Sequence, residues 1–143
     1  MNYFSVAVKK IYKTSSPVYY YPDTREIKLK CTFKGWPRPR VVWYNPDEKQ
    51  IINGSEGFYI SEQLDPEDTL TSLLHNANIQ EKQAGAYKCT GMNGWSSTKL
   101  WYIDLNYQCE SFHFLFLTLI YTRMRKTTTF EAGFIKNIIP CFP

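Results

Sequence analysis

Residues 27–33 read Ile27-Lys28-Leu29-Lys30-Cys31-Thr32-Phe33 and alternate apolar with polar side chains without a break. Successive side chains of a β-strand point to opposite faces, so this alternation predicts a strand that buries one face and exposes the other to water. Cys31 falls on the buried face. Pro37 and Pro39 follow and end the strand, because proline cannot donate a hydrogen bond to a neighbouring strand.

The positions of Cys31, Trp43, Tyr87 and Cys89 carry the strongest signal in the chain. Trp43 follows Cys31 by twelve positions, and Tyr87 precedes Cys89 by two. The runs around them read Gly35-Trp36-Pro37-Arg38-Pro39-Arg40-Val41-Val42-Trp43 and Gly85-Ala86-Tyr87-Lys88-Cys89. These runs resemble the G-x-P-x-P-x-v-x-W and D-x-G-x-Y-x-C signatures of I-set immunoglobulin domains. The resemblance extends over about residues 16–105.

This resemblance implies an all-β fold, an immunoglobulin-like antiparallel β-sandwich of two sheets. It also implies a disulfide between Cys31 and Cys89, with Trp43 packed on the sulfurs and Tyr87 at the corner before the second cysteine. Such a bridge closes a loop of nearly sixty residues. By the chain-entropy relation it stabilises the fold by ~4 kcal/mol, because it restricts the unfolded chain. Two buried free thiols are the alternative. Two further core positions follow from the strand patterns: Leu29 and Leu74.

Two positions depart from the family pattern. The acidic residue of the second signature falls at Gln83, so the ion pair that it forms in the family is missing. An apolar position at the end of the strand predicted over residues 69–75 is taken by Asn76. Both positions belong to the lower half of the predicted sandwich, where we expect departures from a regular I-set domain.

The chain divides into three predicted parts. Its 143 residues suffice for one ordinary domain with extensions. We assign residues 1–15 to an N-terminal extension, 16–105 to a sandwich of about seven or eight strands, and 106–143 to an irregular C-terminal tail. No secretion signal is visible near Met1, which indicates a fragment or an imperfect gene model.

The tail contains an apolar run over residues 112–121, followed by a basic cluster. As a helix this run would rise only ~15 Å, half of the ~30 Å of a hydrocarbon core. Three interpretations stay open: a membrane span, a short segment packed on the domain, or non-native coding sequence. Cys109 and Cys141 could pair with each other, bridge to another chain or stay free.

The sequence predicts no catalytic centre, no metal site and no cofactor, so we expect a protein that is not an enzyme. The histidines His75 and His113 have no cysteine or carboxylate at metal-ligand spacing. Phosphate-binding loops, nucleophile elbows and zinc-protease motifs are missing. A net charge of +4 is too small to indicate a nucleic-acid ligand.

Two polar features are candidates for modification and for polyanion binding. Asn53-Gly54-Ser55 is an acceptor sequence for N-linked sugar in a predicted surface loop. A group of basic side chains could bind a heparin-like sulfated polysaccharide or anionic lipid headgroups. Its members are Lys28, Lys30, Lys34, Arg38 and Arg40. A solvated face that keeps the strand soluble is the simpler interpretation of the same residues.

Aromatic residues make up 17% of the chain, more than one small core can bury. Tyrosine and tryptophan are enriched at protein contact sites, because they bury a large area at a small entropy cost. The candidate contact residues are Trp36, Trp95 and Trp101. Since Trp36 and Trp95 fall at strand ends, each could instead plug a mouth of the sandwich.

Together these patterns favour a non-enzymatic protein-recognition domain of a cell-surface or secreted adhesion or receptor protein, as the resemblance implies. Its partner would be another protein on the same or another cell. Two alternatives stay open: an intracellular structural I-set module, and an ectodomain that binds sulfated polysaccharide. The sequence leaves membrane attachment undecided.

Overall fold

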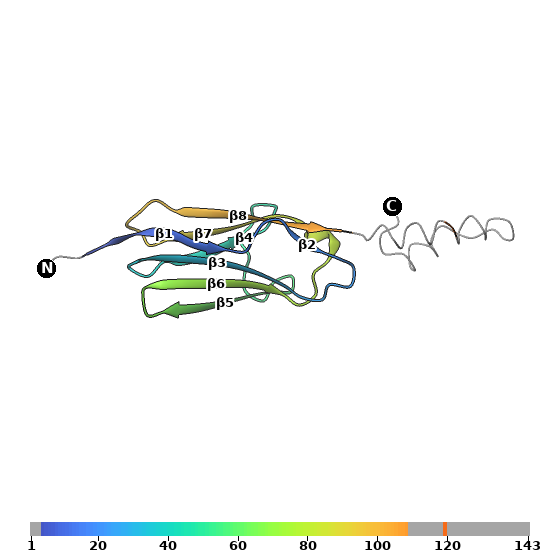
Figure 1. Ribbon diagram of the computed structural model, residues 1–143, viewed down its shortest axis with the longest axis horizontal. Helices are drawn as coiled ribbons and strands as arrows, with labels where there is room; N and C mark the ends of the chain where they lie inside the picture. Colours follow the sequence, from blue (N-terminus) through green and yellow to red (C-terminus); the bar gives the residue numbers. More distant parts are fainter. Residues whose placement is uncertain (1–3, 109–118, 120–143) are drawn as a thin grey trace.

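A computed structural model describes residues 4–108 and residue 119 of the chain. In this part, two four-stranded sheets pack into a β-sandwich, with strand orders β1-β3-β6-β5 and β2-β8-β7-β4 (Figure 1). The strands are β1 (Val6–Lys13), β2 (Val18–Tyr20), β3 (Ile27–Trp36), β4 (Arg40–Tyr44), β5 (Phe58–Asp65), β6 (Thr69–Asn76), β7 (Gly85–Met92) and β8 (Lys99–Tyr107). One 3-10 turn, η1 (Glu81–Gln83), precedes β7. The predicted all-β, two-sheet sandwich is confirmed.

The outer limits of the sandwich differ from the prediction. Strand β1 lies within the predicted N-terminal extension and pairs with β3, while β8 continues to Tyr107. Only Val8 of β1 is fully buried, so residues 6–13 lack the alternation that reveals a half-buried strand. Cys109, Cys141 and, apart from residue 119, the apolar run at residues 112–121 lie outside the described residues. Among the described residues, no helix has both the length and the apolarity to cross a membrane.

One strand pair is parallel within the sandwich that was predicted to be antiparallel. Strand β2 runs parallel to β8, with Val18 opposite Leu105. The chain passes from β1 in the first sheet to β2 in the second without reversing its direction, and β8 runs the same way (Figure 1). The N-terminal region therefore supplies one edge strand to each sheet. Lys13 Nζ closes the seam between β1 and β8 by donating to the Tyr102 carbonyl at 2.7 Å.

The core lies between the inward faces of the two sheets. Leu29 of β3 is paired with Leu74 of β6, and both predicted core residues are fully buried. Burial of one such side chain stabilises the fold by about 1.5–3 kcal/mol. The other large, fully buried side chains are Tyr20, Phe33, Trp43, Phe58, Leu70, Tyr87, Ile103 and Leu105.

Two links join the sheets at the same level. The disulfide connects Cys31 of β3 to Cys89 of β7, as the resemblance implied, with 6.6 Å between the Cα atoms. Trp43 lies opposite Cys89 and donates its indole N–H to Ser72 Oγ at 2.9 Å. Ser72 lies opposite Cys31 on β6, and all four side chains are fully buried. A covalent bond and a buried hydrogen bond therefore cross the core side by side.

The corner before β7 is held by Tyr87. Its hydroxyl donates to the backbone carbonyl of Gln83 at 2.7 Å, at the end of η1. The ring packs 5.8 Å from that of Phe58, measured between centroids. Burial raises the pKa of Tyr87, because the charged phenolate would lose its hydration there.

Candidate recognition surface

The outer face of β8, β7 and β4 presents two rows of side chains that cross these three strands. Inward and outward side chains alternate along each strand, and paired residues point to the same side of a sheet. Because Trp43, Cys89 and Ile103 point into the core, their neighbours along the strands point outward. We call this surface the β8–β7–β4 face. It consists of Val42, Tyr44, Lys88, Thr90, Leu100 and Tyr102.

The first row places a lysine between two tyrosines. Lys88 of β7 lies opposite Tyr44 of β4 and opposite Tyr102 of β8. Its ammonium group lies 4.7 Å from the centre of the Tyr44 ring and donates to the Glu48 carboxylate. The hydrogen bond to Glu48 raises the pKa of Lys88, so the lysine is charged at neutral pH. Tyr102 is 47% exposed, which leaves its ring open to a contact.

The second row is largely apolar. Thr90 lies opposite Val42 and opposite Leu100. Val42 and Thr90 are buried although they point outward, whereas Leu100 is 42% exposed. Leu100 and Tyr102 are two positions apart on one strand and so share this side of the sheet. Of the side chains in the two rows, the tyrosines belong to a residue type that is enriched in protein contacts.

Trp36 and Trp95, which the sequence proposed as contact residues, lie at one end of the sandwich. Trp36 ends β3 opposite Val6. The Asn93 side chain donates to the Val6 carbonyl at 2.9 Å and accepts from the Trp95 backbone N–H at 3.1 Å. Both tryptophans are more than half exposed, so neither plugs the core at this end.

Trp101 has a different environment from the other two tryptophans. It points inward from β8 and packs on Phe33, with 5.5 Å between the ring centroids. The Lys10 ammonium group lies 5.5 Å from its ring on the seam between the sheets. Trp101 therefore contributes to the rim of the core more than to an open surface.

The predicted polyanion residues are divided between the two sheets and the connection that joins them. Lys28, Lys30 and Lys34 lie on the outer face of β3, whereas Arg40 begins β4 in the other sheet. Lys30 lies 5.2 Å from the centre of the Tyr12 ring. Carboxylates neutralise three members, in the pairs Lys28–Glu26 (3.4 Å), Lys34–Glu67 (3.3 Å) and Arg38–Glu62 (3.8 Å).

Ser61, His75 and Glu26 form a row that the sequence did not reveal. Ser61 Oγ lies 2.9 Å from His75 Nε2, and His75 Nδ1 lies 3.8 Å from Glu26 Oε1. The order is that of a nucleophile, a base and an orienting acid, but 3.8 Å is too long for the hydrogen bond that orients the base. Ser61 is exposed on an edge strand. This row therefore lacks the enclosed geometry that acyl transfer requires.

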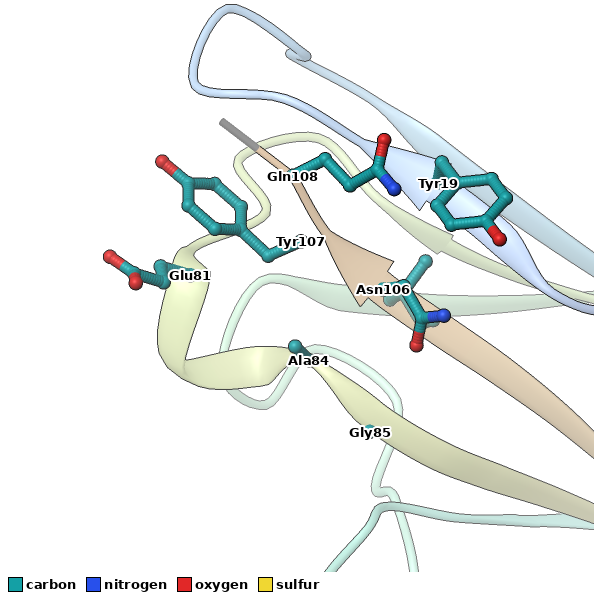
Figure 2. Close-up of a pocket in the computed structure, with 8 residues that line it drawn as sticks. Tyr19, Glu81, Ala84, Gly85, Asn106, Tyr107 and Gln108 are labelled. Atoms are coloured by element: carbon teal, nitrogen blue, oxygen red, sulfur yellow. The ribbon is translucent and has the colours of Figure 1, made fainter. Parts of the chain in front are cut away.

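An open pocket of about 600 Å³ lies at the end of the sandwich where β8 finishes (Figure 2). Glu81 and Tyr107 line one side of it and Tyr19 and Asn106 the other (Figure 2). Among the described residues that line it, Glu81 is the one carboxylate, and histidine, cysteine and lysine are absent. Among the described residues, no group of three metal-ligating side chains is present either.

A known protein family matches this chain. The model of the immunoglobulin domain family matches residues 10–93, which is more than half of the chain. The chain belongs to the immunoglobulin domain family. Its I-set subtype stays a prediction.

Several proteins contain segments that are similar in sequence to this immunoglobulin domain. It is 31% identical over 67 residues to chicken cell adhesion molecule DSCAM, covering 47% of this chain and 3% of the relative. It is 29% identical over 85 residues to human matrix-remodeling-associated protein 5, covering 59% of this chain and 3% of the relative. A titin homolog of Caenorhabditis elegans is 28% identical over 76 residues, 53% of this chain and 0% of the relative. The chain thus spans only about 3% or less of these proteins.

Solved structures show the same immunoglobulin fold. The N-terminal eight domains of DSCAM isoform 1.30.30 match with a TM-score of 0.64 and 17% identity, over 72% of this chain and 14% of that chain. A complex of Dpr2 with DIP-Theta matches with a TM-score of 0.61 and 19% identity, over 73% of this chain and 33% of that chain. The RIG-5 IG1 homodimer matches with a TM-score of 0.57 and 12% identity, over 72% of this chain and 99% of that chain.

Proposed function

We propose that this immunoglobulin domain is a non-enzymatic recognition module of a cell-surface or secreted adhesion or receptor protein. It binds a folded partner protein through the β8–β7–β4 face. The observation that carries this proposal is the row Tyr44–Lys88–Tyr102, in which two aromatic rings flank a cation that is already anchored by Glu48. Tyrosine rings on a rigid sheet contribute contact area with little loss of rotamer entropy on binding.

Relatives support the same class of function. The matched DSCAM is a cell adhesion molecule, and the structural neighbours include a complex of two different proteins and a homodimer. The disulfide between Cys31 and Cys89 agrees with an oxidising, extracellular location. Because this disulfide joins the sheet that carries the face to the other sheet, the face can bind a partner without reorganising.

The test is a binding screen with one matched pair of variants. The chain, displayed as a multimer, is screened against extracellular domains from its own organism. We expect at least one binder whose signal falls tenfold or more with Tyr102→Asp and is unchanged with Tyr59→Asp. Tyr59 is a suitable control because it is 57% exposed on the opposite sheet. Absence of any binder, or a binder that is sensitive to Tyr59→Asp alone, would contradict the proposal.

A second candidate is an intracellular structural module, which the match to a titin homolog favours. The two candidates differ in redox state, since disulfides persist in extracellular proteins and are rare in the cytosol. Thiol labelling of the natural protein, taken directly from its source tissue, separates them. Cys31 and Cys89 that label as free thiols favour the intracellular module, and blocked cysteines favour the extracellular one.

Polysaccharide binding has weaker support from the geometry. Three of the five predicted residues are paired with carboxylates, and Arg40 lies on the other sheet. Surface ion pairs of this kind weaken the local positive potential. We expect the chain to elute from a heparin column at the salt concentration typical of its net charge. Substitution of Lys28 and Lys34 by glutamine should shift that concentration only by the lost charge.

A further inference from the structure

Strand β5 forms an open edge of its sheet, at the bottom of the sandwich in Figure 1. The backbone of Phe58 is bonded away from β6, because its N–H donates to the Ser55 carbonyl at 2.8 Å and its carbonyl accepts from Gly54 N–H at 2.7 Å. Backbone groups alternate in direction along a strand, so those of Ile60, Glu62 and Leu64 also point to the open side. Such a row of backbone groups is a template for pairing with another chain.

The sequon occupies the first part of this edge. Asn53 Oδ1 accepts a hydrogen bond from the Ile60 backbone N–H at 2.9 Å. Residues 53–55 thus form hydrogen bonds with the outward N–H and carbonyl of Phe58 and with the N–H of Ile60. Strand β5 pairs only with β6, so Glu62 and Leu64 continue the edge without a neighbouring strand in the described part of the chain. Leu64 is 49% exposed there.

The geometry of Asn53 suits attachment of a sugar. Asn53 is exposed, and its bond to Ile60 uses only the amide oxygen, which leaves Nδ2 for a glycosidic bond. Gly54 follows with φ at +88°, in a left-handed turn that glycine adopts without strain. Asn53 also lies near the unpaired part of the edge. It is bonded to Ile60, and from Ile60 to Leu64 the strand advances about 13 Å.

We propose that Asn53 carries an N-linked oligosaccharide that shields the open edge of β5 and prevents edge-to-edge pairing. In the transfer, the anomeric carbon of the oligosaccharide bonds to Asn53 Nδ2 and its bond to the phosphate oxygen of a lipid-pyrophosphate donor breaks. The lipid pyrophosphate and one proton leave. A bulky, hydrophilic glycan rooted beside Ile60 covers Glu62 and Leu64. The charge of Glu62 is paired with Arg38 at 3.8 Å, and strand β5 contains neither lysine nor proline, the residues that commonly protect an edge. The inference rests on the extracellular location in the proposed function.

The recognition face stays accessible in this arrangement. The glycan is rooted on the edge of the sheet β1-β3-β6-β5, whereas the β8–β7–β4 face is the outer face of the other sheet. Edge shielding and partner binding are therefore separate properties of the same domain, and they can be tested independently.

The first experiment measures occupancy. The full chain is secreted from eukaryotic cells behind a signal peptide and digested with peptide N-glycosidase. We expect a mobility shift and conversion of Asn53 to aspartate by mass spectrometry, loss of both with Ser55→Ala, and retention of both with Ser55→Thr. Secreted protein with unmodified Asn53 overturns the inference. Modified Asn53 in a chain that binds no partner leaves it intact and counts against the proposed function alone.

The second experiment measures the shielding. Ser55→Ala removes the sugar without altering the Asn53 side chain, and Asn53→Asp removes it while keeping an acceptor for the Ile60 N–H. In sedimentation velocity we expect monomers for the glycosylated chain and concentration-dependent association for both variants. Leu64→Lys, added to Ser55→Ala, should restore the monomer, because a charge on an edge strand opposes pairing. Sugar-free variants that stay as monomeric as the glycosylated chain overturn the shielding role.

Discussion

Asn76 donates its side-chain amide to the backbone carbonyl oxygen of Glu56 at 3.3 Å, from a fully buried position at the end of β6. Gln83 Nε2 donates to the same oxygen at 3.2 Å. Asn76 Oδ1 also accepts from the Asn78 backbone N–H at 2.9 Å. The two positions that depart from the I-set pattern thus act together. They replace an apolar contact and an ion pair by hydrogen bonds that fasten the β4–β5 connection to the base of the sandwich.

Asn76→Leu restores the family's apolar residue and should nevertheless destabilise this chain by about 1–3 kcal/mol. From its fully buried position Asn76 donates to the Glu56 carbonyl and accepts from the Asn78 N–H, and a leucine can form neither hydrogen bond. Gln83→Ala should cost less than 1 kcal/mol by the same reasoning, because Gln83 is partly exposed and water can replace it. Urea unfolding monitored by fluorescence gives both values.

The double variant Asn76→Leu/Gln83→Ala provides the sharper measurement. Each side chain alone can still satisfy the Glu56 carbonyl, so removing both should cost more than the sum of the single changes. If the two losses of unfolding free energy are additive, or if Asn76→Leu stabilises the chain, the shared Glu56 carbonyl does not couple these two residues.

Ser72→Ala tests the hydrogen bond that crosses the core beside the disulfide. The Trp43 indole N–H would stay buried without an acceptor, so we expect a loss of about 1–3 kcal/mol of unfolding free energy. Ser61→Ala is the matched control, since Ser61 is exposed and water can replace its hydrogen bond to His75. Surface substitutions usually stay within about 0.5 kcal/mol. Equal effects of the two substitutions would remove any special role from the Trp43–Ser72 bond.

Replacing Cys31 and Cys89 together by alanine should lower the unfolding free energy by about 4 kcal/mol. The two cysteines are separated by 58 positions, and the chain-entropy relation gives that value for such a loop. Small domains have only about 5–15 kcal/mol in total, so the variant should be largely unfolded at 37 °C. Circular dichroism during a thermal scan, with and without reductant for the unmodified chain, measures the loss. A variant as stable as the oxidised chain would contradict the estimate.

The parts of the fold that the sequence predicts are those where alternation is strict. Residues 27–33 bury every second side chain between two sheets, so their pattern reads directly as β3. Strand β1 escapes prediction because it lies at an edge and buries only Val8. The parallel pairing of β2 with β8 escapes for another reason: two strands of a sheet carry no local signal of their relative direction.

The recognition face is harder to predict than the core. Tyr44, Lys88 and Tyr102 come together only through the register of three strands, and each alone looks like an ordinary outward residue. Asn76 and Gln83 were visible as departures from a pattern, but their shared partner, a backbone carbonyl, has no sequence signature. Side-chain type reveals what a residue can do, whereas register decides which residues act together.

Alkaline pH should unfold this domain through two buried tyrosines. Tyr20 donates its hydroxyl to the Gln80 carbonyl at 2.8 Å, and burial raises its pKa from 10.0 to about 12. Burial raises the pKa of Tyr87 as well. The folded state therefore holds both phenol protons after the unfolded chain has begun to release them, near its ordinary pKa of about 10.

The sign of the effect follows from linkage. The stabilisation is fully present below about pH 10 and is lost as the pH rises toward 12, since the unfolded state then binds fewer protons. Each tyrosine can contribute a slope of at most about 1.4 kcal/mol per pH unit. Thermal scans from pH 8 to about 11.5 should show Tm falling steeply above pH 10, and Tyr20→Phe should flatten that fall. Tyr19→Phe is the control, because Tyr19 is 49% exposed. A Tyr20→Phe variant with the unaltered slope would assign the alkaline transition to other groups.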